Sequence, residues 1–253
     1  MKISAVIISK NEENNIADAI RSLAWADEIL VVDSESTDRT REIAESLGAR
    51  VIVREWPGFS AQKQFAADSA SYDWIFSLDA DERVSDPLKE EILVLKSLSE
   101  SELADGYRIP RLSYYMGRPV RHGGWYPDRQ LRLFDRRKGK WKDVLIHESV
   151  EMAPDAKTGR LERDIIHYSV ENAAYHHRMI GERYAPLAAR QMFERGRRTS
   201  PFRTALAGPS AFIQAYFLKL GLLDGFAGFC IARFAAHHAF LKHAILWEIQ
   251  RGE

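Results

Sequence analysis

The chain has 253 residues, a formal net charge of zero and a single cysteine, Cys230. This length suits one large domain, or one domain with an appendage. The balanced charge excludes nucleic-acid binding through a globally basic surface. One cysteine excludes an intrachain disulfide and fits a reducing, cytoplasmic setting. The apolar run at residues 3–8 is too short for a signal peptide, and no uncharged apolar stretch reaches about 18 residues, so we expect no transmembrane helix.

Strand and helix patterns alternate in the first part of the chain. Short apolar runs predict four strands, at residues 3–8, 28–33, 51–53 and 73–78. Apolar residues at helical spacing predict helices between them, near residues 16–23, 38–48 and 60–70. A further helix is expected from Asp86, where Pro87 takes the favoured first position. The alternation indicates βαβ units, right-handed crossovers and a parallel sheet.

Polar and acidic side chains follow three of these strands, where each strand ends. They are Ser9 to Glu12, Asp33, and the run Asp79-Ala80-Asp81-Glu82. The carboxyl ends of parallel strands meet at one edge of a sheet, which is where ligands bind. Clustered carboxylates repel one another unless a cation lies among them, and their oxygens suit Mg²⁺ or Mn²⁺. The pattern predicts a metal site that grips a diphosphate; a polar turn after a buried strand is the alternative.

Glycine-rich phosphate loops are missing from the sequence. Ser9 to Glu13, after the first strand, contains no Gly-x-Gly-x-x-Gly, and the chain has no Gly-x-x-x-x-Gly-Lys-Ser/Thr. Their absence argues against the usual dinucleotide-binding and P-loop proteins. A bound diphosphate would then be held by a metal ion.

From Tyr107 the pattern changes to short strands separated by glycine, proline and aspartate. Strands are expected at residues 107–109 and 130–134, with a long polar, aromatic loop over residues 117–128 of the kind that often carries function. Many cations follow, and they form either a solvated charged face or a surface for an anionic acceptor. These cations are Arg129, Arg132, Arg136, Arg137, Lys138, Lys140 and Lys142.

The last part of the chain, from about Asn172, is expected to be helical. A basic cluster precedes Pro209 and consists of Arg195, Arg197, Arg198 and Arg203. Aromatic and aliphatic residues at helical spacing follow, with an interruption at residues 221–225. An aromatic amphipathic segment beside a basic cluster favours a helix in the membrane interface. A helix packed on the protein's own core, or a dimer contact, is the alternative.

These motifs resemble those of inverting family 2 glycosyltransferases with the GT-A fold. Within that family, the chain is most similar to the WaaE-like β-1,4-glucosyltransferases that extend the lipopolysaccharide core. The resemblance covers nearly the whole chain. The matching segments are Val6–Glu13, Val31–Asp38, Gln62–Gln64, Leu78–Glu82, Gly124–Phe134, His147–Glu148, and Leu222–Gly225 with Gly228.

The resemblance implies roles for the residues of the nucleotide half. Asp33 would accept a hydrogen bond from the uracil or ribose of a UDP-sugar. Ser9, Asn11 and Glu12 would line the nucleotide pocket, and Lys63 would meet the nucleotide or its phosphates. Many relatives carry two aspartates and a glycine where this chain has Asp33-Ser34-Glu35-Ser36, so the role of Glu35 stays open.

The resemblance also implies a metal and a base. Asp79 and Asp81 would form the Asp-x-Asp motif that holds Mg²⁺ or Mn²⁺ on the diphosphate. The base position carries Pro127-Asp128 instead of the Glu-Asp of many relatives, which makes Asp128 the expected base by its position, with Glu148 as its rival.

His147 stands beside this rival and has three possible roles. It could be a third metal ligand, a donor to the leaving diphosphate, or an ordinary paired histidine.

The expected protein has a GT-A domain over residues 1–170 and an amphipathic helical segment over residues 171–253 that contacts the membrane. It would move a hexose, glucose from UDP-glucose, to a heptose of the lipopolysaccharide inner core or a similar glycolipid. The reaction would take place at the cytoplasmic face of the inner membrane.

Other functions are open. The acceptor could be a polyprenyl phosphate or a capsule or exopolysaccharide intermediate. A nucleotidyltransferase is disfavoured by the missing glycine-rich signature, and a non-catalytic membrane-bound scaffold is disfavoured by the intact pair Asp79 and Asp81.

Overall fold

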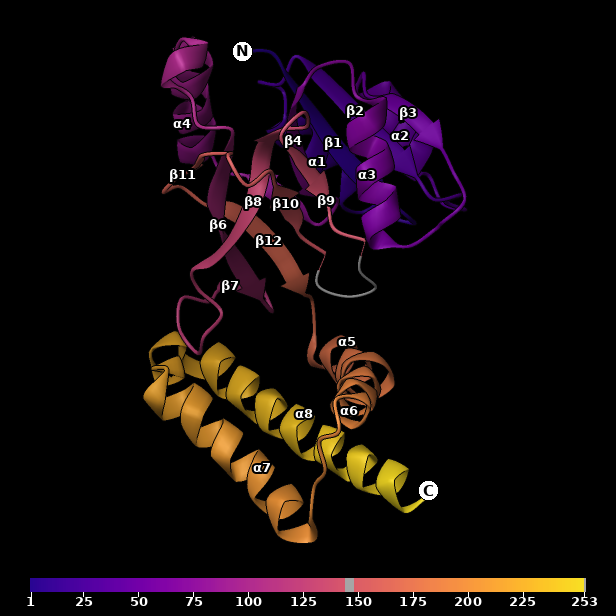
Figure 1. The fold of residues 1–253 in the computed structure, drawn as a ribbon, viewed down its shortest axis with the longest axis vertical. Coiled ribbons are helices and arrows are strands. Elements are labelled where there is room, and N and C mark those ends of the chain that lie inside the picture. Colours follow the sequence, from indigo (N-terminus) through magenta and orange to yellow (C-terminus); the bar gives the residue numbers. More distant parts are fainter. Residues whose placement is uncertain (144–147, 253) are drawn as a thin grey trace. The chain divides into compact units, whose positions relative to one another are not determined.

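The computed structural model describes residues 1–143 and 148–252. Two compact units make up the chain: residues 1–111 with 128–167, and residues 112–127 with those from 168 onward. Figure 1 shows their elements in chain order. The first unit carries the mixed α/β architecture, and the second is mainly helical.

The first unit begins with alternating strands and helices. These are β1 (Ile3–Ser9), α1 (Ile16–Ser22), β2 (Glu28–Asp33), α2 (Thr40–Ser46), β3 (Arg50–Val53), α3 (Phe59–Ser69), β4 (Trp74–Asp79), β5 (Glu82–Val84) and α4 (Asp86–Ser97). Each strand and helix predicted over this region is confirmed, and β5 is an addition. The capping of α4 follows its sequence, because Ser85 accepts a hydrogen bond from the Leu88 amide.

Shorter elements follow. They are the 3₁₀ turn η1 (Glu100–Glu102), β6 (Gly106–Tyr115), β7 (Arg118–Pro119), β8 (Asp128–Asp135), β9 (Gly139–Trp141), β10 (Val150–Met152), β11 (Thr158–Arg160) and β12 (Ile165–Val170). The loop predicted over residues 117–128 is corrected at its two ends. A short strand, β7, occupies its start, and Asp128 is already the first residue of β8 because its backbone pairs with Arg111 of β6.

The described strands of the main sheet run in the order β3-β2-β1-β4-β8-β6-β12-β5, with β7 and β11 also paired to β6. The four strands β3, β2, β1 and β4 are parallel, as predicted. β8 then joins β4 antiparallel. In register, β1 Ser9 lies beside Asp33 and Ile8 lies beside Asp79. The polar ends of β1, β2 and β4 therefore meet at one edge, and the predicted α/β fold class is confirmed.

The central strands are buried on both faces, which explains their continuous apolar sequence. Ile3, Ala5 and Ile7 of β1 pack in one core with residues of α1, α2 and α4. Val6 points into a second core with α3 and the β9–β10 hairpin. With both faces covered, β1 and its neighbours form a rigid base for the side chains at their ends.

The second unit is built from helices that continue the chain after β12. They are α5 (Ala173–Arg178), the π-helical turn η2 (Met179–Tyr184), α6 (Ala185–Glu194), α7 (Pro201–Ile213), the π-helical turn η3 (Gln214–Leu218), the 3₁₀ turn η4 (Gly221–Asp224) and α8 (Gly225–Arg251). The predicted interruption at residues 221–225 is confirmed as η4. A small core of this unit gathers Tyr115, Val120 and Val170 around Ala227 and Ile231 of α8.

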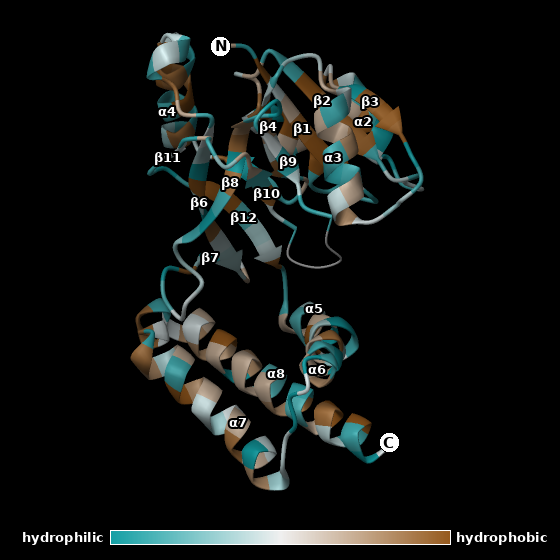
Figure 2. Cartoon of the chain, viewed as in Figure 1, coloured by the Kyte–Doolittle hydropathy of each residue, from teal (hydrophilic) through white to brown (hydrophobic). Residues whose placement is uncertain are grey.

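Two helices of the second unit are rich in apolar residues, as Figure 2 shows along α7 and α8. Within the described chain, none of the individual helices has the length and apolar character of a membrane span. The segments Pro201–Leu218 and Gly221–Arg251 reach the required length and composition only as a pair bent by 73°.

Candidate active site

The end of β2 is organised by a fully buried carboxylate, Asp33. Its Oδ2 accepts a hydrogen bond from the Ser9 hydroxyl at 3.0 Å, and its Oδ1 accepts one from the Ser36 amide at 2.8 Å. The Ser36 hydroxyl also donates to Asp33. The nearest cation is Arg41, 3.8 Å away and largely exposed. Hydroxyl and amide groups of the protein thus satisfy most of the hydrogen-bonding capacity of this carboxylate.

The neighbouring turn after β1 is tied to the same segment. The Asn11 amide donates to the Ser36 hydroxyl at 2.8 Å, and the Asn11 side-chain oxygen accepts from the Thr37 amide at 2.8 Å. Asn11 adopts a left-handed backbone conformation (φ 55°), which asparagine tolerates better than most residues. The Glu12 amide donates to Thr40 at 2.7 Å. The structure therefore brings Ser9, Asn11, Glu12 and Asp33 together, as predicted from the strand order.

Asp79, at the end of β4, has a different environment. Lys63 Nζ lies 2.8 Å from its Oδ1, and Arg132 Nη2 lies 2.9 Å from its Oδ2. Burial alone would raise the pKa of Asp79, but the Arg132 guanidinium and then the Lys63 ammonium outweigh burial and hold that pKa well below its ordinary value. Asp79 is therefore a charged group that two cations of the protein already balance.

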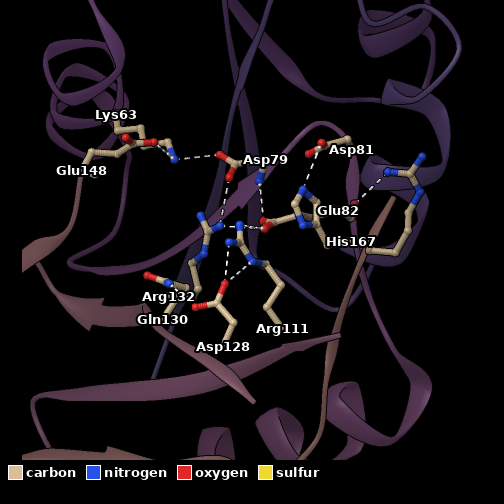
Figure 3. A network of polar contacts seen from close by, with 11 residues as sticks. Lys63, Asp79, Asp81, Glu82, Arg111, Asp128, Gln130, Arg132, Glu148 and His167 are labelled. Carbon is tan, nitrogen blue, oxygen red and sulfur yellow. Dashed lines mark hydrogen bonds and ion pairs between the residues drawn. The ribbon is translucent and has the colours of Figure 1, made fainter. Parts of the chain in front are cut away.

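Glu82 is the centre of the charged network that Figure 3 shows. Its side chain is fully buried, its Oε2 accepts the Asp79 amide at 2.9 Å, and its Oε1 lies 2.7 Å from Arg132 and 3.2 Å from Arg111. Arg132 is buried as well, and only its Nη2 is used by Asp79 and Glu82. In the part of the chain that the structure describes, Arg132 Nε and Nη1 have no hydrogen-bond partner. Such a network is sensitive to the removal of any member.

The two candidate bases lie at opposite ends of this network. Asp128 Oδ2 accepts from Arg111 Nε at 2.9 Å, and its Oδ1 accepts from Gln130 at 2.6 Å. Glu148 Oε1 lies 3.2 Å from Lys63 Nζ. The contacts therefore run from Asp128 through Arg111, Glu82 and Arg132 to Asp79, and on through Lys63 to Glu148. Both carboxylates remain partly exposed, so both can reach a substrate hydroxyl.

Asp81 points away from this chain of contacts and toward a histidine. Its Oδ2 lies 3.2 Å from His167 Nε2, on β12. Burial raises the pKa of Glu12, a hydrogen bond from Asn15 lowers it, and repulsion by Asp81 raises it again, with a net upward shift. The turn after β1 and the turn after β4 lie close together because the two strands are neighbours, with Ile8 beside Asp79. An aspartate and an imidazole that face each other are suitable ligands for a divalent ion.

The structure does not complete a metal site from the protein alone. Over residues 1–143 and 148–252, no group of three or more His, Cys, Asp or Glu side chains is arranged to hold a metal ion. His147, one of the predicted ligands, lies outside the described residues. Magnesium in nucleotide sites is commonly bound by one or two carboxylates, with substrate phosphates and water as the other ligands. Asp81 offers one such carboxylate, and His167 lies beside it at 3.2 Å.

Three residues of this site were not predicted for it: Arg111, Arg132 and His167. Glu82 belongs to the acidic run that was predicted to form the metal site, but its place at the centre of an ion-pair network was not predicted. Arg132 stands in the cation-rich segment after residue 128, where a charged surface or an anionic acceptor was expected. Arg111 and His167 have no local signal, because their positions depend on the pairing of β6 with β8 and of β12 with β5.

Comparison with known proteins gives a consistent result. The sequence profile of the family "Glycosyl transferase family 2" matches residues 4–145. A relative from Rhizobium meliloti, the lipopolysaccharide core biosynthesis glycosyltransferase LpsC, is 31% identical over 256 residues, which cover 98% of this chain and 93% of the relative. An uncharacterized glycosyltransferase of Rickettsia typhi is 32% identical over 261 residues, which cover 98% of this chain and 87% of the relative.

Solved structures are similar over different portions of the chain. Glucosyl-3-phosphoglycerate synthase from Mycobacterium tuberculosis, in complex with Mn²⁺, UDP and glucosyl-3-phosphoglycerate, is 31% identical with a TM-score of 0.36; the match covers 46% of this chain and 44% of the synthase. S. aureus TarS with UDP-GlcNAc is 17% identical with a TM-score of 0.49, over 100% of this chain and 93% of TarS. Because the family profile covers more than half of the sequence and LpsC matches nearly all of it, the chain belongs to glycosyltransferase family 2.

Proposed function

We propose that this family 2 glycosyltransferase transfers a hexose, with inversion, from a UDP-sugar to a glycolipid of the lipopolysaccharide core. The observation that carries the proposal is the charged network around Asp79 and Asp81, at the carboxyl edge of a parallel sheet. The similarity to LpsC over nearly the whole chain supports the core glycolipid as the acceptor class. Glucose as the donor sugar and a heptose as its acceptor are the finer parts of the proposal.

The residues present fit a divalent cation, Mg²⁺ or Mn²⁺. Figure 3 shows Asp81 facing His167, 3.2 Å away, whereas Asp79 is paired with Lys63 and Arg132. Because Lys63 and Arg132 balance Asp79, we assign Asp81 and His167 as the ligands and place Asp79 beside the donor as a charge held in position. When bound, the metal would neutralise charge on the leaving diphosphate. His147 is retained as a proposed further ligand or diphosphate donor.

The nucleotide half of the proposed site is the segment that joins the ends of β1 and β2. Ser9 and Asn11 hold the turn through Asp33 and Ser36, which leaves a preformed backbone surface for the uridine. Asp33 is assigned to the recognition of the uracil or ribose through the Ser36 segment that it holds, because its own carboxylate is fully buried, and Glu12 is assigned to the rim of the pocket. Lys63 lies between Asp79 and Glu148 and is assigned to the phosphates, which would compete with these carboxylates for its charge.

The chemical step needs a carboxylate that takes the proton from the acceptor hydroxyl as this hydroxyl attacks the sugar. We assign this role to Asp128, whose Oδ2 is anchored by Arg111 and whose Oδ1 accepts a hydrogen bond from the neutral Gln130. Arg111 and Gln130 orient the carboxylate, so that it need not reorganise during the reaction. Glu148 is the second candidate, because it reaches the same network through Lys63.

The two parts of the sequence are assigned different tasks in this proposal. Residues 1–170 carry the GT-A nucleotide-sugar chemistry, and residues 171–253 hold the enzyme at the cytoplasmic face of the inner membrane. A polyprenyl phosphate or a capsule or exopolysaccharide intermediate is the alternative acceptor. A non-catalytic, membrane-bound scaffold is the alternative to catalysis.

A donor screen tests the proposal directly. The full chain is incubated with UDP- and GDP-sugars and Mn²⁺, without an acceptor, and release of the nucleoside diphosphate is followed. Slow hydrolysis of UDP-glucose in preference to GDP-sugars is the expected result. No hydrolysis, and no protection by UDP and Mn²⁺ in a thermal melt, would favour the scaffold.

A metal titration tests the ligand assignment. His167→Ala should raise the Mn²⁺ concentration needed for half-maximal hydrolysis by about tenfold or more. Removing a side chain that binds a metal, or that orients one of its ligands, typically weakens metal affinity by at least this factor. His177→Ala is the matched control, since His177 is exposed and stacks on His237 in the second unit. An unchanged Mn²⁺ requirement in His167→Ala would remove His167 from the metal site.

A further inference from the structure

The exposed surface of α7, η3 and η4 in the second unit is unusually apolar for a water-facing surface. More than half of the exposed large hydrophobic side chains that the structure describes fall between Phe202 and Phe229. They form two groups, which together we call the apolar patch. One lies along α7 and η3 and contains Phe202, Leu206, Ile213 and Phe217; the other lies at the turn and contains Leu218, Leu220, Leu223 and Phe226.

The positions of the first group follow the helical repeat. Phe202, Leu206, Ile213 and Phe217 are separated by four, seven and four residues, so they share one side of a continuous helix. The other side of α7 packs on α8, where Gly208 allows a close approach to the Ala236 carbonyl. The exposed side is therefore a second apolar face, left over after the helix has packed within its own unit.

The turn group is also strongly exposed. Leu218 and Phe226 keep 74% and 73% of their surface accessible. The turn itself is well anchored, because the Asp224 carboxylate accepts from the amides of Arg121 and His122 and from the His122 ring. Exposure of these side chains is thus a feature of an ordered turn, and contiguous patches of this kind usually mark an interaction surface.

Charge indicates the partner. From Arg195 to Leu223 the sequence contains no aspartate or glutamate, although the whole chain carries equal numbers of acids and bases. Arg195, Arg197 and Arg198 precede the apolar face, Arg203 lies at its start next to Phe202, and Lys219 follows it; all five are exposed. A second copy of this surface would repel the first, whereas anionic phospholipids attract it by about fivefold in affinity for each cation near the membrane.

Composition, and not length, argues against α8 as a simple membrane span, since its 27 residues are long enough to cross a bilayer. Its central part contains Arg233, His237, His238 and Lys242, which would be costly at the centre of a bilayer. A helix with one apolar face and basic ends is suited to the interface of a single leaflet.

We propose that the apolar patch inserts into the interfacial layer of one anionic phospholipid leaflet, with Arg195 to Arg203 and Lys219 on the headgroups. The purpose of this contact rests on the proposed function. An enzyme held at the leaflet meets a lipid-linked acceptor by diffusion in two dimensions.

Vesicle sedimentation tests this contact with the full chain. The wild type should bind vesicles made of phosphatidylcholine and phosphatidylglycerol. It should bind vesicles of phosphatidylcholine alone more weakly, by about tenfold or more. The double substitution Leu218→Glu with Phe226→Glu should weaken binding to the anionic vesicles by about tenfold or more, because two apolar groups no longer insert. Val94→Glu is the matched control: Val94 is 62% exposed, but it lies on α4 in the first unit.

Three results would overturn the proposal. The first is failure of the wild type to sediment with anionic vesicles. The second is sedimentation of the double variant to the same extent as the wild type. The third is a wild type that does not bind vesicles but forms a dimer, with the double variant monomeric. Hydrolysis of UDP-glucose without vesicles is measured in parallel and should be equal in the wild type and in both variants. If the wild type does not hydrolyse UDP-glucose at all, the proposed function is refuted, whether or not the protein binds vesicles.

Discussion

Asp33 and Asp79 end two parallel strands on either side of β1, yet the protein satisfies them in opposite ways. Asp33 lies beside Ser9 and is held by hydroxyl groups and an amide, with Arg41 at 3.8 Å as its nearest cation. Asp79 lies beside Ile8 and is held by Lys63 and Arg132. The same sheet edge therefore has a half built on hydrogen bonds and a half built on ion pairs.

This difference indicates which half of the site responds to a bound ligand. The hydrogen-bonded half is complete within the protein, so it can present a rigid surface to a nucleoside. The ion-paired half holds charged side chains in a buried setting. A bound anion or cation there changes the electrostatic energy of every charged group in the network. Substitutions in the ion-paired half should therefore affect catalysis, pH dependence and stability strongly, and those in the hydrogen-bonded half should have smaller effects.

The largest effect is expected from Asp81→Asn. The change removes a charge from the proposed metal site, and we expect turnover to fall by about a thousandfold. Asp81 is partly exposed and its contact is with His167, so the midpoint of thermal unfolding should stay within a few degrees. The measurement is kcat/KM for donor hydrolysis at saturating Mn²⁺.

Asp18→Asn is the control for this change, because Asp18 is exposed and pairs with Arg21. Near-normal turnover of Asp81→Asn in excess chelator would show that the ion-paired half does not use a metal.

The next effect separates the two candidate bases. Asp128→Asn should bind UDP normally and turn over about a hundredfold more slowly, because the amide cannot take the acceptor proton. Transfer rate is compared with UDP affinity in the same preparation, since the base contributes to the first and not to the second. If Asp128→Asn is active and Glu148→Gln shows the hundredfold loss, the role passes to Glu148.

Stability should depend strongly on Arg132. Arg132→Met leaves the buried Glu82 with Arg111 and leaves Asp79 with Lys63, so we expect the free energy of unfolding to fall by about 3 kcal/mol. Arg21→Met is the matched control, because its ion pair with Asp18 is exposed and should contribute about 0.5 kcal/mol or less. Equal losses in urea unfolding for the two variants would contradict a structural role for the buried network.

Acid should act on the same network through Asp79. The pKa of this carboxyl lies well below its ordinary value in the folded protein, where burial is outweighed by Arg132 and Lys63. Its stabilisation is therefore fully present above the pKa of an unfolded aspartate, about 3.9, and is lost as the pH falls through the folded pKa. Urea unfolding of the metal-free protein between pH 7 and about 3 measures the onset of this loss, which begins near the pKa of an unfolded aspartate.

The loss should be smaller than that caused by Arg132→Met, because a protonated Asp79 still accepts hydrogen bonds. Asp79→Asn should lose this part of the pH dependence. A pH profile of Asp79→Asn that parallels the wild type would assign the acid sensitivity to other carboxylates.

The two halves of the site differ in how far the sequence could predict them. β1, β2 and β4 are continuous apolar runs because both of their faces are buried, so their ends and the residues Ser9, Asp33 and Asp79 could be located from local patterns. The order of parallel strands then placed these ends together. Family resemblance supplied the roles that local patterns could not.

The ion-paired half depends on contacts between segments far apart in the sequence. Arg132 reaches Asp79 because β8 pairs with β4, and its charge is hidden in a cation-rich segment. Arg111 and His167 are polar residues within strands β6 and β12, and nothing in the neighbouring sequence distinguishes them from solvent-facing residues. Register between distant antiparallel strands decides such partners, and register is set by the assembled sheet.

The smallest effect is expected in the hydrogen-bonded half, from Ser36→Ala. The hydroxyl donates to Asp33 and accepts from the Asn11 amide, so its removal should lower the free energy of unfolding by about 1 kcal/mol. Ser46→Ala is the matched control, since the exposed Ser46 hydroxyl donates to the Ile43 carbonyl of its own helix. Because the hydroxyl also orders the segment assigned to uridine, UDP affinity should fall by up to about fivefold, the equivalent of about 1 kcal/mol. Isothermal titration with UDP measures this; lowered stability with unchanged UDP affinity would mean that the segment after Asp33 is structural and that the nucleotide is read elsewhere.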